Sequence, residues 1–199
     1  MLLRLAAALA MFWFRRGFYR EGHTWLARAL ERPSSLSKAR MEVLRHAARL
    51  AKEYARDFAR AGALTEEWRT TAERTGDEWE LRMAMNAAAR LSQAKGDLDA
   101  ARAGLITVQA MADEAGDRDM HGTAAVNLAT VAIDAGDFRS ALQHSTEAER
   151  VLREVGNEPG LAAALGNQGW SALGLGDHAL ADKSSARHSS SRTASDGSP

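Results

Sequence analysis

Apolar and small residues recur at helical spacing through most of the chain. One such stripe, at positions i, i+3, i+4, i+7 and i+10, consists of Phe138, Ala141, Leu142, Ser145 and Ala148. This spacing predicts an amphipathic helix with one buried face. Ala, Leu, Arg and Glu, which favour helices, dominate the composition, and only 3 of the 199 residues are proline. The pattern therefore predicts an all-α protein.

A pair of turn residues interrupts these helices at a period of twenty residues. Its glycines are Gly76, Gly96, Gly116, Gly136, Gly156 and Gly176, each followed by Asp except Gly156, which precedes Asn157. Glycine ends a helix because it adopts the left-handed conformation without steric cost. The Asp or Asn side chain then caps the next helix. Arg56 stands where the next glycine upstream is expected.

Alignment on these turns gives a forty-residue unit of two helices, with one turn inside each helix pair and one between pairs. We expect an α-solenoid of about five antiparallel helix pairs over residues 1–182. The predicted units are residues 1–35, 36–75, 76–115, 116–155 and an incomplete 156–182. Ala101, Ala141 and Ala181 occupy the same place in three units. A small residue there is expected to let the two helices of a pair approach closely.

The end of the chain departs from this pattern. After Leu180 no large apolar residue occurs, and residues 183–199 are mostly serine, arginine and other small or polar residues. Such a composition buries too little surface to offset the entropy lost on ordering, so we expect a disordered tail. The sequence favours a truncation or reading-frame change near residue 183 over a partner that covers the open end.

Charge and composition narrow the range of functions. The net charge is zero, but residues 1–60 carry thirteen Lys or Arg against five Asp or Glu, and the remainder carries the opposite excess. This asymmetry predicts docking onto a charged neighbour, head-to-tail self-association, or only an uneven use of solvated helix faces.

The lack of cysteine excludes disulfides and thiolate chemistry and fits a cytoplasmic setting. The apolar run 5–14 is too short to span a membrane and is expected to be a buried first helix.

Several of these residues form a pattern that resembles the tetratricopeptide repeat (TPR). In the fourth unit they are Asn127-Leu128-Ala129, Gly136-Asp137-Phe138, Ala141 and Ala148, and in the fifth Asn167, Gly169, Gly176-Asp177 and Ala181. The resemblance covers residues 37–182. It implies a non-enzymatic helical-repeat scaffold that binds a protein or peptide.

The opening segment, RLAAALAMFWFRRGFYREGHTWLARALE, is similar to the stretch that follows the nucleotide-binding module in bacterial regulators of the LuxR and signal-transduction ATPase type. This similarity implies a sensing or interaction arm that docks to an ATPase or DNA-binding module. The chain itself has no G-x-x-x-x-G-K-[ST] phosphate loop and no evident DNA-reading helix-turn-helix. At most, therefore, it corresponds to the repeat arm alone.

The TPR resemblance also implies a peptide-binding groove lined by the first helix of each pair. Asn127 and Asn167 lie forty residues apart at equivalent positions, and an asparagine offers a peptide backbone both a donor and an acceptor. The other candidate groove residues are Arg90, Gln93, Thr130, Asp134 and Trp170. The alternative is that these asparagines only tie adjacent helices together. If they bind a peptide, replacing both with alanine should weaken binding without changing helicity.

Other patterns carry no chemistry in their context. Residues 35–38 spell S-x-x-K and residues 174–179 spell G-x-G-x-x-A, but the first is a linker and the second a repeat turn. The six histidines lack metal-ligand spacing, although His121 and His144 could meet between helices. We therefore expect no catalytic site, no metal and no cofactor.

An alternative function is a nucleic-acid contact through the basic first sixty residues. Its phosphate contacts would come from Arg15, Arg16, Arg20, Arg40, Arg45, Arg49, Arg56 and Arg60. Affinity would then fall steeply with salt.

Overall fold

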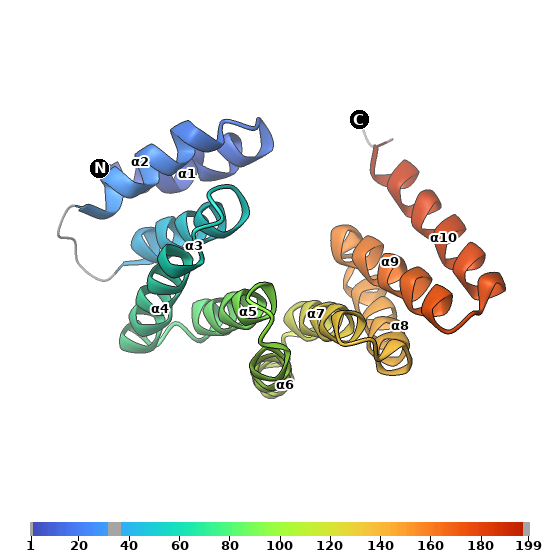
Figure 1. Ribbon diagram of the computed structural model, residues 1–199. Helices are drawn as coiled ribbons and strands as arrows, with labels where there is room; N and C mark the ends of the chain where they lie inside the picture. The colour runs from blue at the N-terminus through green and yellow to red at the C-terminus, as the bar shows by residue number, and fades with distance from the viewer. Residues whose placement is uncertain (1, 32–36, 197–199) are drawn as a thin grey trace. The chain divides into compact units, whose positions relative to one another are not determined.

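The computed structural model describes residues 2–31 and 37–196, with side chains as far as Arg187. Within these residues the chain forms ten α-helices and no strand (Figure 1). This confirms the predicted all-α class. The boundary at residues 35 and 36 and the start of the S-x-x-K segment lie outside the described residues.

The chain divides into two compact units, Met1–Lys95 and Gly96–Pro199. The division falls in a repeat turn, in the middle of the unit predicted for residues 76–115. The helices of unit 1 are α1 (Leu2–Arg15), α2 (Tyr19–Glu31), α3 (Lys38–Glu53), α4 (Phe58–Thr75) and α5 (Glu78–Ala94). The helices of unit 2 are α6 (Leu98–Glu114), α7 (Arg118–Asp134), α8 (Phe138–Val155), α9 (Glu158–Gly174) and α10 (His178–Asp196).

Helices that follow one another in the chain pack together inside each unit. In unit 1, α1 packs on both α2 and α3, and α4 packs on α3 and α5. In unit 2, α8 packs between α7 and α9, and α9 also contacts α7 and α10. Contact between every second helix, as between α7 and α9, is what a stack of helix pairs produces.

The turns between helices depend on one backbone conformation. The six glycines of the twenty-residue series all have positive φ, between 66° and 85°. At each of these turns the following side chain caps the next helix, as where the Asp97 carboxylate accepts from the Ala100 N–H at 3.1 Å. Gly17, between α1 and α2, also has a positive φ of 74°. This turn could not be recognised from the Gly-Asp series because no aspartate follows Gly17.

Arg56 takes the place of glycine at the turn before α4. Its φ of 55° makes it the one non-glycine residue with positive φ in the described part of the chain. A residue with a Cβ atom loses about 1–2 kcal/mol of conformational free energy when it adopts this left-handed conformation. The Arg56 guanidinium lies over the Phe58 ring, with 5.3 Å between Cζ and the ring centroid. This cation–π contact offsets part of the conformational cost.

We expect Arg56→Gly to raise the free energy of unfolding by about 0.5–1 kcal/mol, because glycine adopts positive φ without strain. Urea unfolding followed by circular dichroism measures the change. Gly76→Ala, at the next turn of the same unit, is the matched control and should lower stability. A loss of stability in Arg56→Gly would show that the strain is offset locally.

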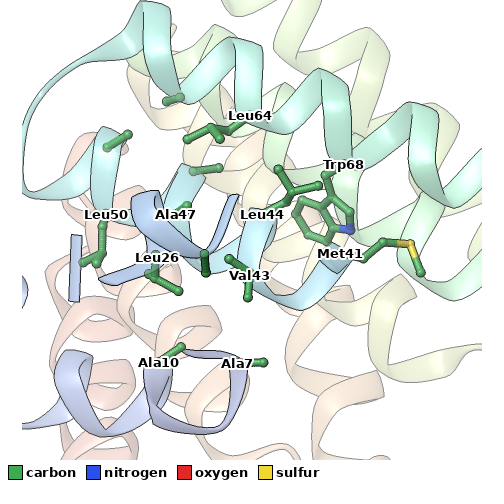
Figure 2. Close-up of a cluster of buried hydrophobic side chains, with 14 of the residues drawn as sticks. Ala7, Ala10, Leu26, Met41, Val43, Leu44, Ala47, Leu50, Leu64 and Trp68 are labelled. Atoms are coloured by element: carbon green, nitrogen blue, oxygen red, sulfur yellow. The ribbon is translucent and has the colours of Figure 1, made fainter. Parts of the chain in front are cut away.

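The core of unit 1 lies where α1, α2, α3 and α4 meet. Figure 2 shows its side chains, among them Ala10 from α1, Leu44 from α3 and Trp68 from α4. Trp68 is 1% exposed although it is the largest side chain in this core. Its indole nitrogen donates to the buried Glu80 carboxylate at 2.8 Å. This hydrogen bond satisfies the indole N–H, which is the only polar group in the buried tryptophan side chain.

The core of unit 2 depends on small residues. Ala101, Ala141 and Ala181 are all buried, as their shared place in the repeats predicted. Gly122 in α7 makes a closer contact still, because a Cβ built on it would lie 2.6 Å from Leu152 Cγ of α8. The absence of a side chain at Gly122 therefore provides the space that Leu152 fills.

The last helix, α10, begins within the predicted fifth unit. The predicted end of the repeat domain at residue 182 lies inside this helix (His178–Asp196), and that boundary stays a prediction. Ser184 is fully buried, and Arg187 forms an ion pair with Glu149 of α8. Small residues meet at this contact, because a Cβ built on Gly169 of α9 would lie 3.9 Å from Ser184 Cβ. The large apolar residues on which the prediction depended are therefore not needed for this contact.

Candidate functional site

The paired asparagines lie on α7 and α9 of unit 2, where these helices are in contact. The Asn167 side-chain nitrogen Nδ2 donates to the Val126 carbonyl and to Thr130 Oγ1, both at 3.1 Å. These bonds tie α9 to α7, which is the role that the alternative interpretation gave to the asparagines. Within the described residues, no donor reaches the Asn167 carbonyl oxygen Oδ1.

Trp170 lies one turn after Asn167 and is the most exposed large apolar residue of the described chain. Its side chain is 67% exposed, and Leu173, one further turn along α9, is 50% exposed. Residues at this spacing share a helix face. Of the other predicted groove residues on α7, Asn127 is half-buried and Asp134 is exposed. We call Asn127, Thr130, Asp134, Asn167 and Trp170 the α7–α9 face.

A buried polar cluster holds the other side of α9. Gln168 Nε2 donates to Glu149 Oε2 at 2.6 Å and to the Ser145 carbonyl at 3.3 Å. The same carboxylate pairs with Arg153 at 2.5 Å and with Arg187 of α10. These contacts fix the rotation of α9 about its axis, so Asn167 and Trp170 have a defined direction.

The two remaining predicted groove residues belong to unit 1. Arg90 is exposed and Gln93 half-buried, and both lie on α5. Of the seven residues that the sequence assigned to one groove, five lie in unit 2 and two in unit 1, and the single groove stays a prediction. Arg90 also lines a cavity that the sequence analysis did not anticipate.

This cavity has a volume of about 350 Å³ and lies among α1, α3, α4 and α5 of unit 1. One part of its lining is apolar and includes Trp68, Met83, Ala87 and Leu91. Another part carries the cationic groups Arg45, Arg49, Lys52 and Arg90. Arg45, Arg49 and Lys52 follow one another at i, i+4 and i+7 on α3. That spacing was visible in the sequence and could have indicated a cationic helix face.

Burial disfavours the charged forms of several basic groups in this lining. The Arg49 guanidinium lies over the Phe14 ring, 3.3 Å from its centroid, and its Nη2 is buried without a hydrogen-bond partner among the described residues. Desolvation lowers the pKa of Arg49 and of Lys52, and the nearby Arg90 charge lowers both further. Burial, together with Arg45 and Arg49, also lowers the pKa of His46 to about 4. His46 is therefore neutral at physiological pH.

Glu80 faces this cluster from α5. It is 1% exposed, and burial raises its pKa, although Arg45 and the Trp68 hydrogen bond act in the opposite direction. Arg45 Nη1 lies 4.0 Å from Glu80 Oε1, so the charge of Arg45 is partly balanced inside the protein.

The histidines form no metal centre in the part of the chain that the structure describes. The ring of His121 lies between two carboxylates, with Nδ1 2.5 Å from Asp113 and Nε2 3.4 Å from Glu147. These contacts join α6, α7 and α8 of unit 2. Burial lowers the pKa of His144, with Arg102 and Asp137 as its nearby charges.

Solved structures of repeat proteins share this architecture. The crystal structure of BtubC (BKLC) from P. vanneervenii is similar with a TM-score of 0.74 and 15% identity, covering 98% of this chain and 81% of that one. The structure of a putative kinesin light chain from Podospora anserina, with nearly identical TPR-like repeats, has a TM-score of 0.70 and 16% identity over 98% and 97% of the two chains. A point variant of that protein has a TM-score of 0.72. The fold is TPR-like.

These similarities establish the fold alone, because the identities are low. No protein-family model matches the sequence, and a search of curated proteins by sequence gives no significant match. Among the described helices, none combines the length and apolar character that crossing a bilayer requires. A TPR-like fold is consistent with a scaffold for protein interaction.

Proposed function

We propose that this chain is a non-enzymatic helical-repeat scaffold whose α7–α9 face binds an extended peptide. The observation that carries the proposal is the exposure of Trp170, at 67%, on a helix whose rotation is fixed by buried polar contacts. Tryptophan is enriched among residues that dominate binding energy at protein interfaces. An exposed indole on a helix held in this way provides an apolar anchor at a defined place on the surface.

The polar groups beside Trp170 suit a peptide backbone. Asn167 Oδ1 is an acceptor without a donor in the described structure, and it lies one turn from the indole. Because Nδ2 of the same amide is held by α7, the direction of Oδ1 is set before a ligand arrives. A peptide N–H could donate to Oδ1 while an apolar side chain packs on Trp170. The Asn127 amide and the Asp134 carboxylate extend the polar part of the face along α7.

A peptide-display selection tests this function. Random peptides on phage are selected on the full chain, and the best binders are measured by fluorescence polarisation against wild type and variants. We expect Trp170→Ala to weaken binding by about tenfold to a hundredfold, because an anchor residue contributes about 2 kcal/mol or more. The matched control is Ile106→Ala, which removes another exposed apolar residue of unit 2, 54% exposed on α6. Equal losses in the two variants would overturn the proposal.

The double variant Asn127→Ala/Asn167→Ala tests the polar part of the same face. Binding should weaken and helicity should persist, but stability should also fall, because Asn167 holds α9 to α7. Unchanged peptide affinity would limit the asparagines to their structural role.

A role as the sensor or interaction arm of a bacterial transcriptional or signalling regulator is a finer proposal. It is supported by the similarity of residues 4–31 to the segment that follows the ATPase module in such regulators. The nucleic-acid alternative has less support from the geometry. Arg40 pairs with Glu67, and Arg45 lies near Glu80, so these cations already have acidic partners.

A further inference from the structure

The cavity of unit 1 differs in character from the α7–α9 face. It is a hollow bounded by four helices, and its volume of about 350 Å³ lies at the lower end of the range for small-molecule sites. A hollow of this volume suits a small ligand better than an extended chain. Its lining is divided between apolar groups and charged groups, so a ligand that fills it needs both an apolar part and an ionic part.

The charged part of the lining has an excess of cations. The four cationic side chains face only two carboxylates in the lining, Glu42 and Glu53. Glu53 lies 3.9 Å from Arg49 Nε and 3.8 Å from Lys52 Nζ, so it is shared between two cations. Arg45 has Glu80 as a partner outside the lining. After these pairings the cavity retains about one uncompensated positive charge.

Arg49 provides positive charge for an anion in the cavity. Its Nη2 is buried and has no hydrogen-bond partner among the described residues, although its Nε faces Glu53 and its plane stacks on Phe14. A buried guanidinium donor without an acceptor costs roughly 1–3 kcal/mol or more. Nη2 itself has almost no accessible surface, so a carboxylate in the cavity would interact with the positive charge of Arg49 and accept hydrogen bonds from the exposed Arg90.

We propose that the cavity of unit 1 binds a small amphipathic monocarboxylic acid, with the carboxylate beside Arg49 and Arg90 and the apolar body against Met83, Ala87 and Leu91. A single negative charge matches the excess of the lining, whereas a dianion such as phosphate would leave one negative charge without compensation. This inference goes beyond the proposed function, because the α7–α9 face could bind a peptide whether or not unit 1 holds a ligand.

Calorimetric titration of the full chain near neutral pH tests the inference, with octanoate as the probe. Acetate supplies the carboxylate without the apolar body, and 1-octanol supplies the apolar body without the charge. We expect octanoate to bind at least about tenfold more tightly than either, because both halves of the lining contribute. In a Trp170→Phe background the remaining tryptophans all lie in unit 1, and their emission should also change on binding because Trp68 lines the cavity.

Two variants change the two halves of the cavity separately. Arg90→Ala removes an exposed cation, and Ala87→Phe places a ring in the apolar part; each should weaken octanoate binding by about tenfold or more. Arg74→Ala, which removes an exposed arginine of unit 1 outside the cavity lining, is the matched control and should bind like wild type.

Absence of octanoate binding at millimolar concentrations, or unchanged affinity in Ala87→Phe, would overturn the proposal. Acetate or inorganic phosphate binding as tightly as octanoate would show a purely ionic site and would also overturn it. A short peptide with a free C-terminal leucine distinguishes the source of the carboxylate. Binding of that peptide in preference to octanoate would contradict a small-molecule site. Peptide binding at the α7–α9 face is measured with different variants, so the two proposals can fail independently.

Discussion

Acidification should destabilise unit 1 by up to about 3 kcal/mol through the buried His46 alone. In the unfolded chain His46 takes up a proton near its ordinary pKa of 6.5, but in the folded protein only near pH 4. Between these values the unfolded state binds more protons. The free energy of unfolding therefore falls as the pH is lowered through this window, and the loss is complete below about pH 4.

Urea unfolding at a series of pH values measures this effect, with tryptophan fluorescence as the probe. Trp13, Trp25, Trp68 and Trp79 lie in unit 1, so a Trp170→Phe background reports unit 1 alone. His46→Gln removes the titrating group, and the difference in stability between the two proteins isolates its contribution. The raised pKa of Glu80 opposes the trend, but it is common to both proteins. A difference that does not change between pH 7 and pH 4 would contradict the burial of a neutral His46.

The second large effect is expected at two helical glycines of unit 2. Gly122→Ala would place a Cβ 2.6 Å from Leu152 Cγ and Cδ2, whereas a Cβ at Gly166 of α9 meets nothing within 4 Å. Leu152 is fully buried and cannot move away without disturbing the core. Overpacking of this kind costs about 1–3 kcal/mol. Gly166→Ala should instead stabilise the protein by about 0.5–1 kcal/mol, because alanine favours the helix and restricts the unfolded chain.

Thermal and urea unfolding of both alanine variants, followed by circular dichroism, compare these outcomes. The two substitutions are chemically identical and lie in neighbouring helices, so helix propensity cancels in the comparison. We expect opposite signs, with Gly122→Ala below wild type and Gly166→Ala above it. If both variants were stabilised, the contact between α7 and α8 would be looser than the structure shows.

The helices and their turns could be predicted from the sequence because local signals determine them. Helical periodicity marked the buried stripes, and the glycine and aspartate pairs marked the ends of helices. Arg56 could be placed at a turn only because the twenty-residue period required a left-handed residue there. Gly17 was missed for the converse reason, since its turn lacks the aspartate that made the others visible.

The sites could be predicted only in part because they depend on contacts between helices. The equivalent positions of Asn127 and Asn167 followed from the period, but the bonds from Asn167 to Val126 and Thr130 did not. The predicted end of the repeats at residue 182 depended on large apolar residues, and a contact between small residues does not meet that criterion. Ser184 instead packs through its small size. The cavity needed the meeting of four helices, although the spacing of the cations on α3 was visible beforehand.

The glycines of the repeat turns have open space around them. No neighbouring atom lies within 4 Å of where a Cβ would stand at Gly76, Gly96, Gly116, Gly136, Gly156 or Gly176. Their requirement is a dihedral angle and not a contact, so a replacement such as Arg56 disturbs no neighbour. Turns of this kind can diverge one at a time without changing how the helices stack. Repeat proteins built in this way can keep a common shape long after their sequences have ceased to resemble one another, as identities of 15–16% with the solved structures illustrate.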